Sequence, residues 1–221
     1  MNGPHDLGGQ LGLGSVKPQP ETEESIFYAE WERRVFGLML AVGALGKWNL
    51  DQSRHARERQ NIRDYLKKSY YENWLAGLET LLLESGLLTL EELITEIPKQ
   101  QSDLENYPPL RSTDVAPMLK KGQSVAMECI REPCFSTGQS IRMKDIDPTG
   151  YTRAPSYVRG RAGIIRACYG AFIYPDKNAE GETVAEYLYN VEFSSATLWE
   201  SNVDQRNMVR VDLFEPYFDP L

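Results

Sequence analysis

Two segments centred on arginine contain the side chains best suited to chemistry. In the first, Asp51–Arg59, Arg54 lies one helical turn before a glutamate. In the second, Gly150–Arg161, Pro155 disfavours helix at the residue before it, so Arg153 is expected on an extended or turning stretch. A guanidinium group can hold an oxyanion through paired N–H bonds. Taken alone, each arginine is most simply interpreted as a surface charge.

The sequence contains no self-contained catalytic or metal-binding motif. Its three cysteines, Cys129, Cys134 and Cys168, lack Cys-x-x-Cys spacing, and its two histidines, His5 and His55, are far apart in the chain. The carboxylates are scattered, and the glycines near the N-terminus are not followed by the lysine of a phosphate-binding loop. We therefore expect small buried thiols in a reducing compartment, no metal bound by this chain, and no catalysis by the chain alone.

The composition is that of a soluble globular protein. The 221 residues have a formal net charge of −8, with 41% hydrophobic and 25% charged residues. An acidic balance argues against a protein that coats nucleic acid. The longest apolar run, Val35–Gly46, is too short to cross a membrane, and the N-terminus lacks the pattern of a secretory signal. A cytoplasmic protein that binds neither nucleic acid nor membrane is expected.

The first hundred residues are expected to be mostly helical. A glycine- and proline-rich arm, residues 1–24, precedes a helical domain, residues 25–98. The arm is either disordered or orders against a partner. Apolar residues recur at steps of three or four, which is typical of one face of an amphipathic helix. They are Phe27, Trp31, Val35, Leu38, Val42 and Leu45, and then Leu66, Tyr70, Trp74, Leu78 and Leu81.

The second half is expected to be mostly β. A proline-containing linker, residues 99–121, leads to a second domain, residues 122–221. Alternation of apolar and polar residues predicts strands over Tyr187–Phe193 and Val209–Leu213, and Gly163–Gly170 predicts another. Several short strands in such a length favour a small barrel over a sandwich. The predicted fold class is α+β, with a helical N-terminal domain followed by a small β-barrel.

The helical half has more large aromatic side chains than one layer of helices can easily bury. Rings that pack inside would belong to the core, whereas rings left exposed would mark an interface or an apolar pocket. These residues are Trp31, Phe36, Trp48, Tyr70, Tyr71 and Trp74.

Several blocks of the sequence resemble, in order, the β subunit of nitrile hydratase. They include Met1–Gly9, Tyr28–Glu32, Ser69–Trp74, Pro148–Gly163 and Val211–Tyr217. No one block is diagnostic, but together they extend over nearly the whole chain. The resemblance implies that the small barrel is Src-homology-3-like (SH3-like).

The resemblance also implies an obligate partner. In that family the α subunit holds a non-haem iron or a non-corrin cobalt through a cysteine cluster, and two of those cysteines are oxidised. The active site lies between the subunits and hydrates nitriles to amides. This chain would itself bind no metal or cofactor, and an α2β2 assembly acting on small nitriles is expected.

The resemblance also implies site residues, each at the position of this sequence that matches a site residue of the family. Arg54 and Arg153 match family arginines that hydrogen-bond the oxidised cysteines. Those cysteines are anions, and buried anions need charge-assisted partners. At position 36 this sequence differs from some relatives, which have tyrosine where it has phenylalanine. The expected substrate pocket consists of Phe36, Trp48, Tyr70 and Trp74.

Two other functions stay open from the sequence. A thiocyanate-hydrolysing relative uses the same kind of metal cluster, and its anionic substrate would require positive charge in the pocket. A non-catalytic module that binds RNA or protein is a third interpretation, because Arg159–Arg166 resembles the strand-and-turn signature of small RNA-binding barrels. Residues 122–221 contain more acidic than basic side chains, which disfavours binding to phosphate.

Overall fold

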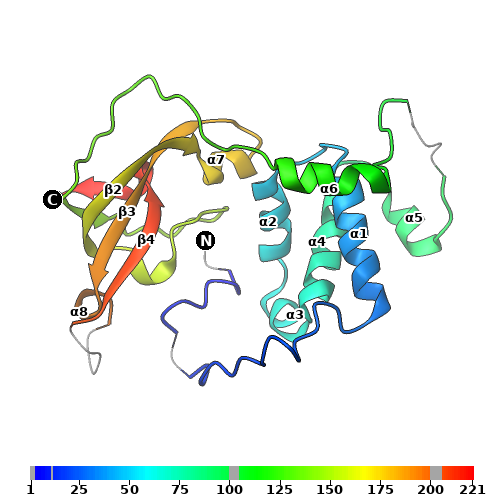
Figure 1. Cartoon of the computed structure of the whole chain (residues 1–221), viewed down its shortest axis with the longest axis horizontal. Helices are drawn as coiled ribbons and strands as arrows, with labels where there is room; N and C mark the ends of the chain where they lie inside the picture. Colours follow the sequence, from blue (N-terminus) through cyan, green and yellow to red (C-terminus); the bar gives the residue numbers. More distant parts are fainter. Residues whose placement is uncertain (1–2, 11, 100–104, 200–205) are drawn as a thin grey trace. The chain divides into compact units, whose positions relative to one another are not determined.

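The chain folds into two compact units. The computed structural model describes residues 3–10, 12–99, 105–199 and 206–221. The helical unit comprises Gly12–Gln123, and the sheet unit comprises Met1–Leu11 together with Ser124–Leu221 (Figure 1). The predicted arm, residues 1–24, is thus divided between the two units.

The regular secondary structure of the helical unit is helical among the residues described. Its helices are α1 (Glu30–Gly43), α2 (Leu50–Glu58), α3 (Ile62–Lys67), α4 (Tyr70–Glu84), α5 (Leu90–Thr95) and α6 (Ser112–Lys121). Helix α6 occupies the second half of the segment predicted as a linker, residues 99–121. Two of the helix starts follow directly from side-chain caps. The Asn49 carboxamide accepts the N–H groups of Asp51 and Gln52 at 3.0 and 2.9 Å, and Thr89 and Glu92 cap each other.

Helix α4 is the centre of the helical unit, because both α1 and α2 pack against it. Tyr71, Leu78 and Leu81 of α4 are buried, as are Val35 of α1 and Ala56 of α2. The period of three to four residues predicted Leu78 and Leu81 correctly, whereas Leu66 and Tyr70 of the same pattern are exposed and Tyr71 is buried instead. The sequence pattern, however, suggested one helix continuing from Leu66 through Leu81.

A break separates α3 from α4. Lys68 is extended, with φ −68° and ψ 148°, and Ser69 then starts the next helix. The Glu72 carboxylate accepts the Ser69 N–H at 2.7 Å, which completes a capping box. This local polar interaction interrupts an apolar pattern that alone would continue, and it places Tyr70 in the first turn of α4.

The sheet unit is built on one antiparallel sheet in the order β4-β3-β2-β1-β5. Its strands are β1 (Ser140–Met143), β2 (Ala162–Ile173), β3 (Ala185–Ser194), β4 (Met208–Phe214) and β5 (Phe218–Pro220). Short helices α7 (Pro175–Ala179) and α8 (Ser195–Leu198) and the 3-10 turns Ser156–Val158 and Glu215–Tyr217 connect them. The predicted strands Tyr187–Phe193, Val209–Leu213 and Gly163–Gly170 lie within β3, β4 and β2.

The predicted closed barrel is wrong for the residues that the structure describes. There, β4 and β5 stand at the two ends of the sheet and do not pair with each other. The stretch around Ala126 makes only an isolated bridge to Phe172, and β5 has three residues and ends at Pro220. Strands this short supply too few ladder hydrogen bonds to close the sheet. Register shifts in β2 bend it without closing it.

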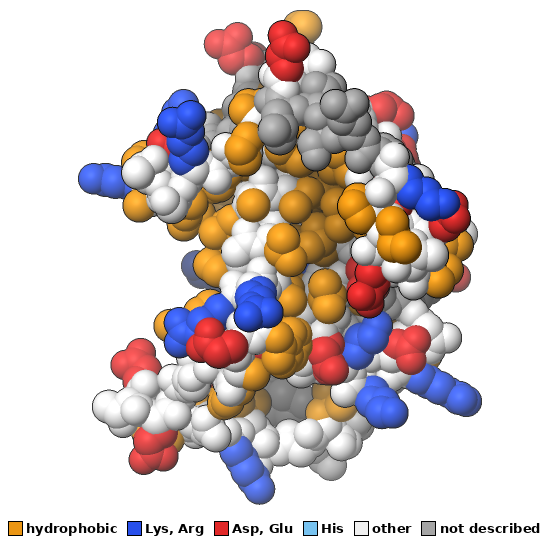
Figure 2. All heavy atoms as spheres, turned by 90° about the vertical axis from the view of Figure 1, so that its right-hand side faces the viewer, with side chains coloured by type: hydrophobic (Ala, Val, Ile, Leu, Met, Phe, Trp, Pro, Cys, Tyr) orange, Lys and Arg blue, Asp and Glu red, His pale blue; other side chains and the backbone are white. Residues whose placement is uncertain are grey.

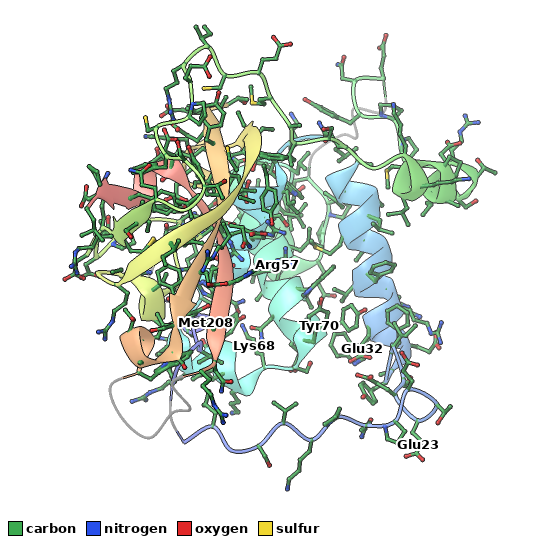
Figure 3. All side chains as sticks on the ribbon, turned by 60° about the vertical axis from the view of Figure 1, so that its left-hand side comes forward. Glu23, Glu32, Arg57, Lys68, Tyr70 and Met208 are labelled. Carbon is green, nitrogen blue, oxygen red and sulfur yellow. The ribbon has the colours of Figure 1, made fainter. Side chains whose placement is uncertain are left out.

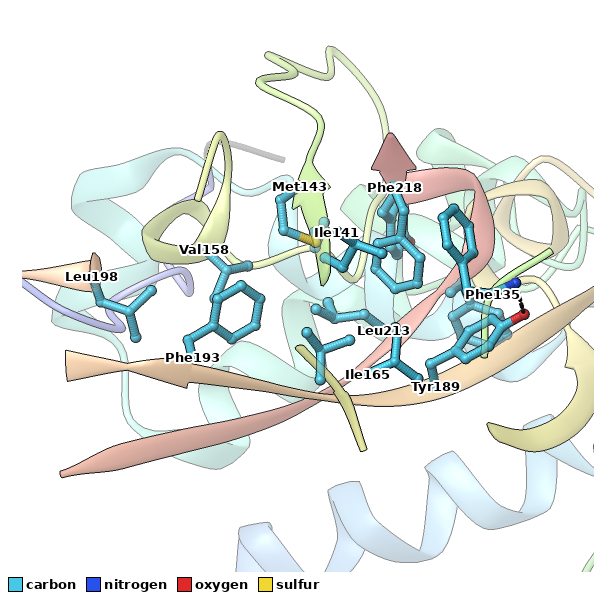
Figure 4. Packing of buried hydrophobic residues seen from close by; sticks show 14 residues of the cluster. Phe135, Ile141, Met143, Val158, Ile165, Tyr189, Phe193, Leu198, Leu213 and Phe218 are labelled. Atoms are coloured by element: carbon cyan, nitrogen blue, oxygen red, sulfur yellow. Dashed lines mark hydrogen bonds between the residues drawn. The ribbon is translucent and has the colours of Figure 1, made fainter. Parts of the chain in front are cut away.

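One face of the sheet covers the core of this unit. Tyr189, Val191 and Phe193 of β3 are buried on alternate positions, as the period of two requires. They pack with Ile141, Ile165 and other apolar side chains (Figure 4). The Tyr189 hydroxyl, buried among them, donates to the Glu215 carboxylate.

The described start of the chain packs against the sheet unit. Asp6 accepts the Ser156 N–H at 3.0 Å and faces the Arg159 guanidinium at 3.6 Å, and both side chains of this ion pair are nearly buried. Gly9, at φ 75°, lies so close to Trp199 that a Cβ there would stand 2.9 Å from the indole nitrogen. Residues 3–10 are therefore ordered by their own chain.

A first prediction concerns the close packing of β2 against the side chains of its neighbour β3. A Cβ on Gly163 would lie 2.7 Å from Val191 Cγ1 and 2.8 Å from a Phe193 ring carbon. We expect Gly163→Ala to lower the free energy of unfolding by about 1–3 kcal/mol, because both neighbours are fixed in the core. Gly150→Ala is the matched control, since it meets nothing within 4 Å. Urea denaturation compares them, and equal midpoints for the two variants would contradict the prediction.

Candidate functional site

A small pocket in the helical unit collects arginine and aromatic side chains from α2, α3 and α4. It encloses about 220 Å³. Its lining residues are Arg54, Arg57, Glu58, Tyr65, Tyr70, Asn73 and Trp74. Arg57 and Tyr70 are labelled in Figure 3. Three of the sequence-predicted site residues, Arg54, Tyr70 and Trp74, thus meet in one place.

The Arg54 side chain is held by an ion pair on one side and is exposed to solvent on the other. It lies on α2, and its Nη1 is 3.5 Å from the carboxylate of Asp51, one turn earlier on the same helix. Asp51 is buried, whereas 43% of the Arg54 side chain is exposed. The carboxylate therefore orients the guanidinium from the protein side and leaves its outer part accessible to an anion.

Arg57 is a pocket residue that the sequence analysis did not single out. Its guanidinium carbon lies 4.8 Å from the centre of the Trp74 ring, and its Nε donates to the Ser53 carbonyl at 3.1 Å. These contacts fix the cation over an aromatic face. The spacing of three residues from Arg54 places both on neighbouring positions of one helix, which is the signal that would have found it.

Asn73 contributes a second unanticipated polar group. Its Nδ2 donates to the carbonyls of Tyr65 at 3.0 Å and Lys68 at 3.5 Å, tying α4 to α3. Among the described residues, its buried Oδ1 has no hydrogen-bond partner. The pocket thus has an acceptor oxygen beside two arginines.

The aromatic side of the pocket continues toward α1. Tyr70 is 65% exposed and contacts Trp74, with ring centres 5.3 Å apart. Phe36 of α1 also contacts Trp74, with ring centres 6.5 Å apart. Phe36, Tyr70 and Trp74 therefore form one aromatic cluster. Trp48 is not among the residues that line this pocket, and its role in the substrate pocket stays a prediction.

Arg153 belongs to the sheet unit, and its loop is built differently. The Arg153 side chain is exposed, whereas Tyr151, Thr152 and Ala154 are buried. The Arg153 N–H donates to the Tyr217 hydroxyl at 3.1 Å, and its guanidinium carbon lies 5.8 Å from the Tyr151 ring centre. As the proline predicted, the residue is not helical. The two candidate arginines lie in different units, and each is described within its own.

A cavity of about 220 Å³ lies beside Arg153. The start of the chain and the Thr152–Tyr157 stretch line it, including His5 and Asp6. Burial, with the positive charge of Arg153, lowers the pKa of His5 to about 4, so this imidazole is neutral at pH 7. Arg153 and His5 both line this cavity. The arginine is charged at pH 7, whereas the imidazole is neutral.

A third cavity, of about 410 Å³, surrounds a polar cluster that the sequence analysis did not anticipate. Arg131 pairs with both Glu186 and Glu215. Cys134 lies beside them, and its hydrogen bond to the Glu215 carboxylate is the largest of the effects that raise the pKa of the thiol. A raised pKa keeps the thiol protonated and unreactive. The expectation of small buried thiols is wrong for Cys134 and Cys168, which are exposed.

Over the ranges that the structure describes, no group of three or more His, Cys, Asp or Glu side chains is placed to hold a metal ion. In the same residues, no helix is both long and apolar enough to span a membrane.

Comparison with known proteins identifies the class and then the family. Residues 1–124 match the family model "Nitrile hydratase beta subunit, N-terminal", and residues 110–220 match "Nitrile hydratase beta subunit, C-terminal". The chain is therefore a subunit of an enzyme of the hydro-lyase class. It belongs to the nitrile hydratase beta subunit family.

Individual relatives agree over their full length. The chain is 35% identical to the low-molecular weight cobalt-containing nitrile hydratase subunit beta of Rhodococcus rhodochrous, and 33% identical to nitrile hydratase subunit beta of Pseudomonas putida, with 100% of both chains covered in each case. Thiocyanate hydrolase subunit alpha of Thiobacillus thioparus is 32% identical over 71 residues, which cover 32% of this chain and 56% of the relative.

A second prediction tests how the pocket is held. Gly77 of α4 packs against Arg57, and a Cβ there would overlap with the Arg57 Cγ and approach its backbone nitrogen to 3.3 Å. Gly77→Ala should displace Arg57 from Trp74 and lower the free energy of unfolding by about 1–3 kcal/mol. Gly37→Ala in α1 meets nothing within 4 Å. It should instead gain about 0.5–1 kcal/mol from helix propensity. Equal stability of the two variants in urea denaturation would contradict this account.

Proposed function

We propose that this chain is the β subunit of a nitrile hydratase in which the metal is held by an α subunit. Membership of the family implies that partner. The single observation that carries the proposal is the pocket in which Arg54, Tyr70 and Trp74 meet beside Phe36. It offers a cation for an anion of the partner and an apolar wall for an organic substrate.

Arg54 and Arg153 hold the oxidised cysteines of the partner in this proposal. Sulfenate and sulfinate oxygens accept hydrogen bonds, and a guanidinium offers paired donors that a single ammonium cannot. Both arginines have exposed side chains on fixed backbone, and Asp51 orients Arg54 from within. These contacts keep the oxidised oxygens in place and tune the ligands electronically.

Phe36, Tyr70 and Trp74 bind the substrate. A nitrile is small and weakly polar, so aromatic faces remove its organic part from water and leave the cyano group to point away from them. Trp48, which is not among the lining residues of the pocket, remains a predicted pocket residue.

An exposed apolar face supports the partnership. Helices α1, α5 and α6 bear exposed Leu38, Ile94 and Leu119. Figure 2 shows hydrophobic side chains gathered in a hollow on this face of the helical unit. Contiguous apolar surface of this kind is costly in water and typical of a subunit interface. We assign it to the α subunit, in an α2β2 assembly located in the cytoplasm.

In this proposal the chain does not bind the metal directly. It interacts with the oxidised cysteine ligands that hold the metal in the partner. The residues described here supply cations for those ligands and no set of metal donors. When bound in the partner, an iron or cobalt ion supplies Lewis-acid activation. The residues of this chain bind the substrate, exclude water from its organic part and orient the ligand oxygens.

A third prediction tests the arginines in the assembled αβ enzyme. Arg54→Lys and Arg153→Lys each keep the charge but lose the paired donors. We expect turnover of a nitrile to fall by about 10- to 100-fold while the subunits still assemble. Arg210→Lys is the control, because Arg210 is a surface residue paired with Glu192. Near-normal turnover in the two test variants would overturn the assigned role.

Substrate class is tested with the same preparation. The full-length relatives reported above are nitrile hydratases, whereas the thiocyanate hydrolase match covers about a third of the chain. We expect the assembled enzyme to hydrate a nitrile and not to hydrolyse thiocyanate. Hydrolysis of thiocyanate without nitrile hydration would favour the alternative relative.

A further inference from the structure

The backbone around Arg153 is held by a hydrogen-bond network that ends on one carboxylate, Asp176. Asp176 lies in the first turn of α7, directly after Pro175. We propose that Asp176, acting through the Tyr217 hydroxyl, is the positioning residue that fixes Arg153 for the reaction. This inference rests on the proposed role of Arg153 toward the oxidised cysteines.

The network contains a direct connection between the carboxylate and the arginine. The Tyr217 hydroxyl donates to Asp176 Oδ1 and accepts the Arg153 N–H at 3.1 Å. Thr152 and the Arg153 N–H also favour the charged form of Asp176 and lower its pKa, against burial, which raises it. A phenol that is itself bound to one carboxylate thus holds the Arg153 backbone N–H.

A second hydroxyl reaches the same carboxylate from another direction. The Tyr174 hydroxyl donates to Asp176 Oδ2 at 3.0 Å. Its ring packs on the Tyr217 ring, with centres 5.7 Å apart. Tyr174 therefore stabilises Asp176 and Tyr217, but within the described part of the chain its hydroxyl donates to Asp176 and not to residues 152–154. This difference between two tyrosines provides the experiment.

The residues around Arg153 are fixed on both sides. Tyr217 is 2% exposed, and Thr152 and Ala154, the two neighbours of Arg153, are also buried. The Ala154 carbonyl accepts two bonds from Arg159, at 3.1 and 2.9 Å. Arg153 is the exposed side chain between these tied neighbours, so a shift of the Tyr217 hydroxyl moves the point from which its guanidinium extends.

A purely structural role is the competing explanation. Burial raises the pKa of Asp176, so enclosing this carboxylate costs free energy that an apolar residue of similar size would not. Hydrogen bonds offset the cost only in a fixed geometry. The polar network is therefore better suited to setting the position of a backbone than to filling a core.

The test compares Tyr217→Phe with Tyr174→Phe in the assembled αβ enzyme. Both variants delete one hydroxyl from the same carboxylate. We expect Tyr217→Phe to lower kcat for a nitrile about tenfold with KM changed less than about twofold, because the lost group acts on the metal ligands and not on the substrate. Tyr174→Phe should keep kcat within about twofold. Equal losses in both variants would indicate a structural role and overturn the proposal.

A double variant separates this inference from the proposed function. If Tyr217 acts through Arg153, adding Tyr217→Phe to Arg153→Lys should change kcat by less than about twofold further. Multiplication of the two single losses would overturn positioning through Arg153. Normal kcat in Arg153→Lys alone would overturn the proposed function, whereas a loss there with normal kcat in Tyr217→Phe would overturn only the inference.

Asp176→Asn covers the case in which Tyr217→Phe does not assemble. The carboxamide has the same size and still accepts a hydrogen bond, but it lacks the charge that strengthens bonds from Tyr217 and Thr152. We expect a loss of kcat in the same direction that again disappears in the Arg153→Lys background. An Asp176→Asn enzyme with unchanged kcat would overturn the proposal.

Discussion

An arginine can hold an anion of another chain only if its guanidinium reaches the surface while its backbone stays fixed. Both candidate arginines meet this condition. Arg54 projects from a helix whose neighbouring residues Asp51 and Ser53 are buried, and Arg153 is exposed between buried Thr152 and Ala154. The helical unit fixes its arginine by packing α2 on α4, and the sheet unit fixes its own by a polar network.

The periodic parts of the fold could be predicted from the sequence, because period reports which face is buried. The apolar steps identified α1 and the later turns of α4, where Leu78 and Leu81 are buried, and alternation identified β3 and β4. The periodicity of apolar residues does not indicate which distant segments pair with each other. The three-residue β5 and the lone bridge at Ala126 decide that the described sheet stays open, and both depend on long-range register. The α3–α4 break depends instead on a cap at Ser69 that competes with an apolar pattern.

The candidate site was predictable to a similar degree. Resemblance pointed to Arg54, Tyr70 and Trp74, which the fold brings into one pocket. Arg57 was missed because its role depends on its contact with the face of the Trp74 ring. That contact is possible because Gly77 has no side chain and lets Arg57 pack closely against α4. The pairing of Asp176 with Tyr217 joins residues from two different connections of the sheet. Nothing in their local sequence indicates that they meet.

The start of the chain shows why a segment without secondary structure can still belong to a site. A glycine-rich stretch pays a high conformational cost when it is ordered, so contacts must compensate. Here Asp6 supplies a nearly buried ion pair with Arg159, and Arg159 in turn bonds the carbonyl of Ala154, next to Arg153. Close packing at Gly9 tolerates no side chain. The loop that presents Arg153 is thereby supported from one side by Asp176 and from another by the first residues of the chain, so the order of the arm and the position of the arginine depend on the same contacts.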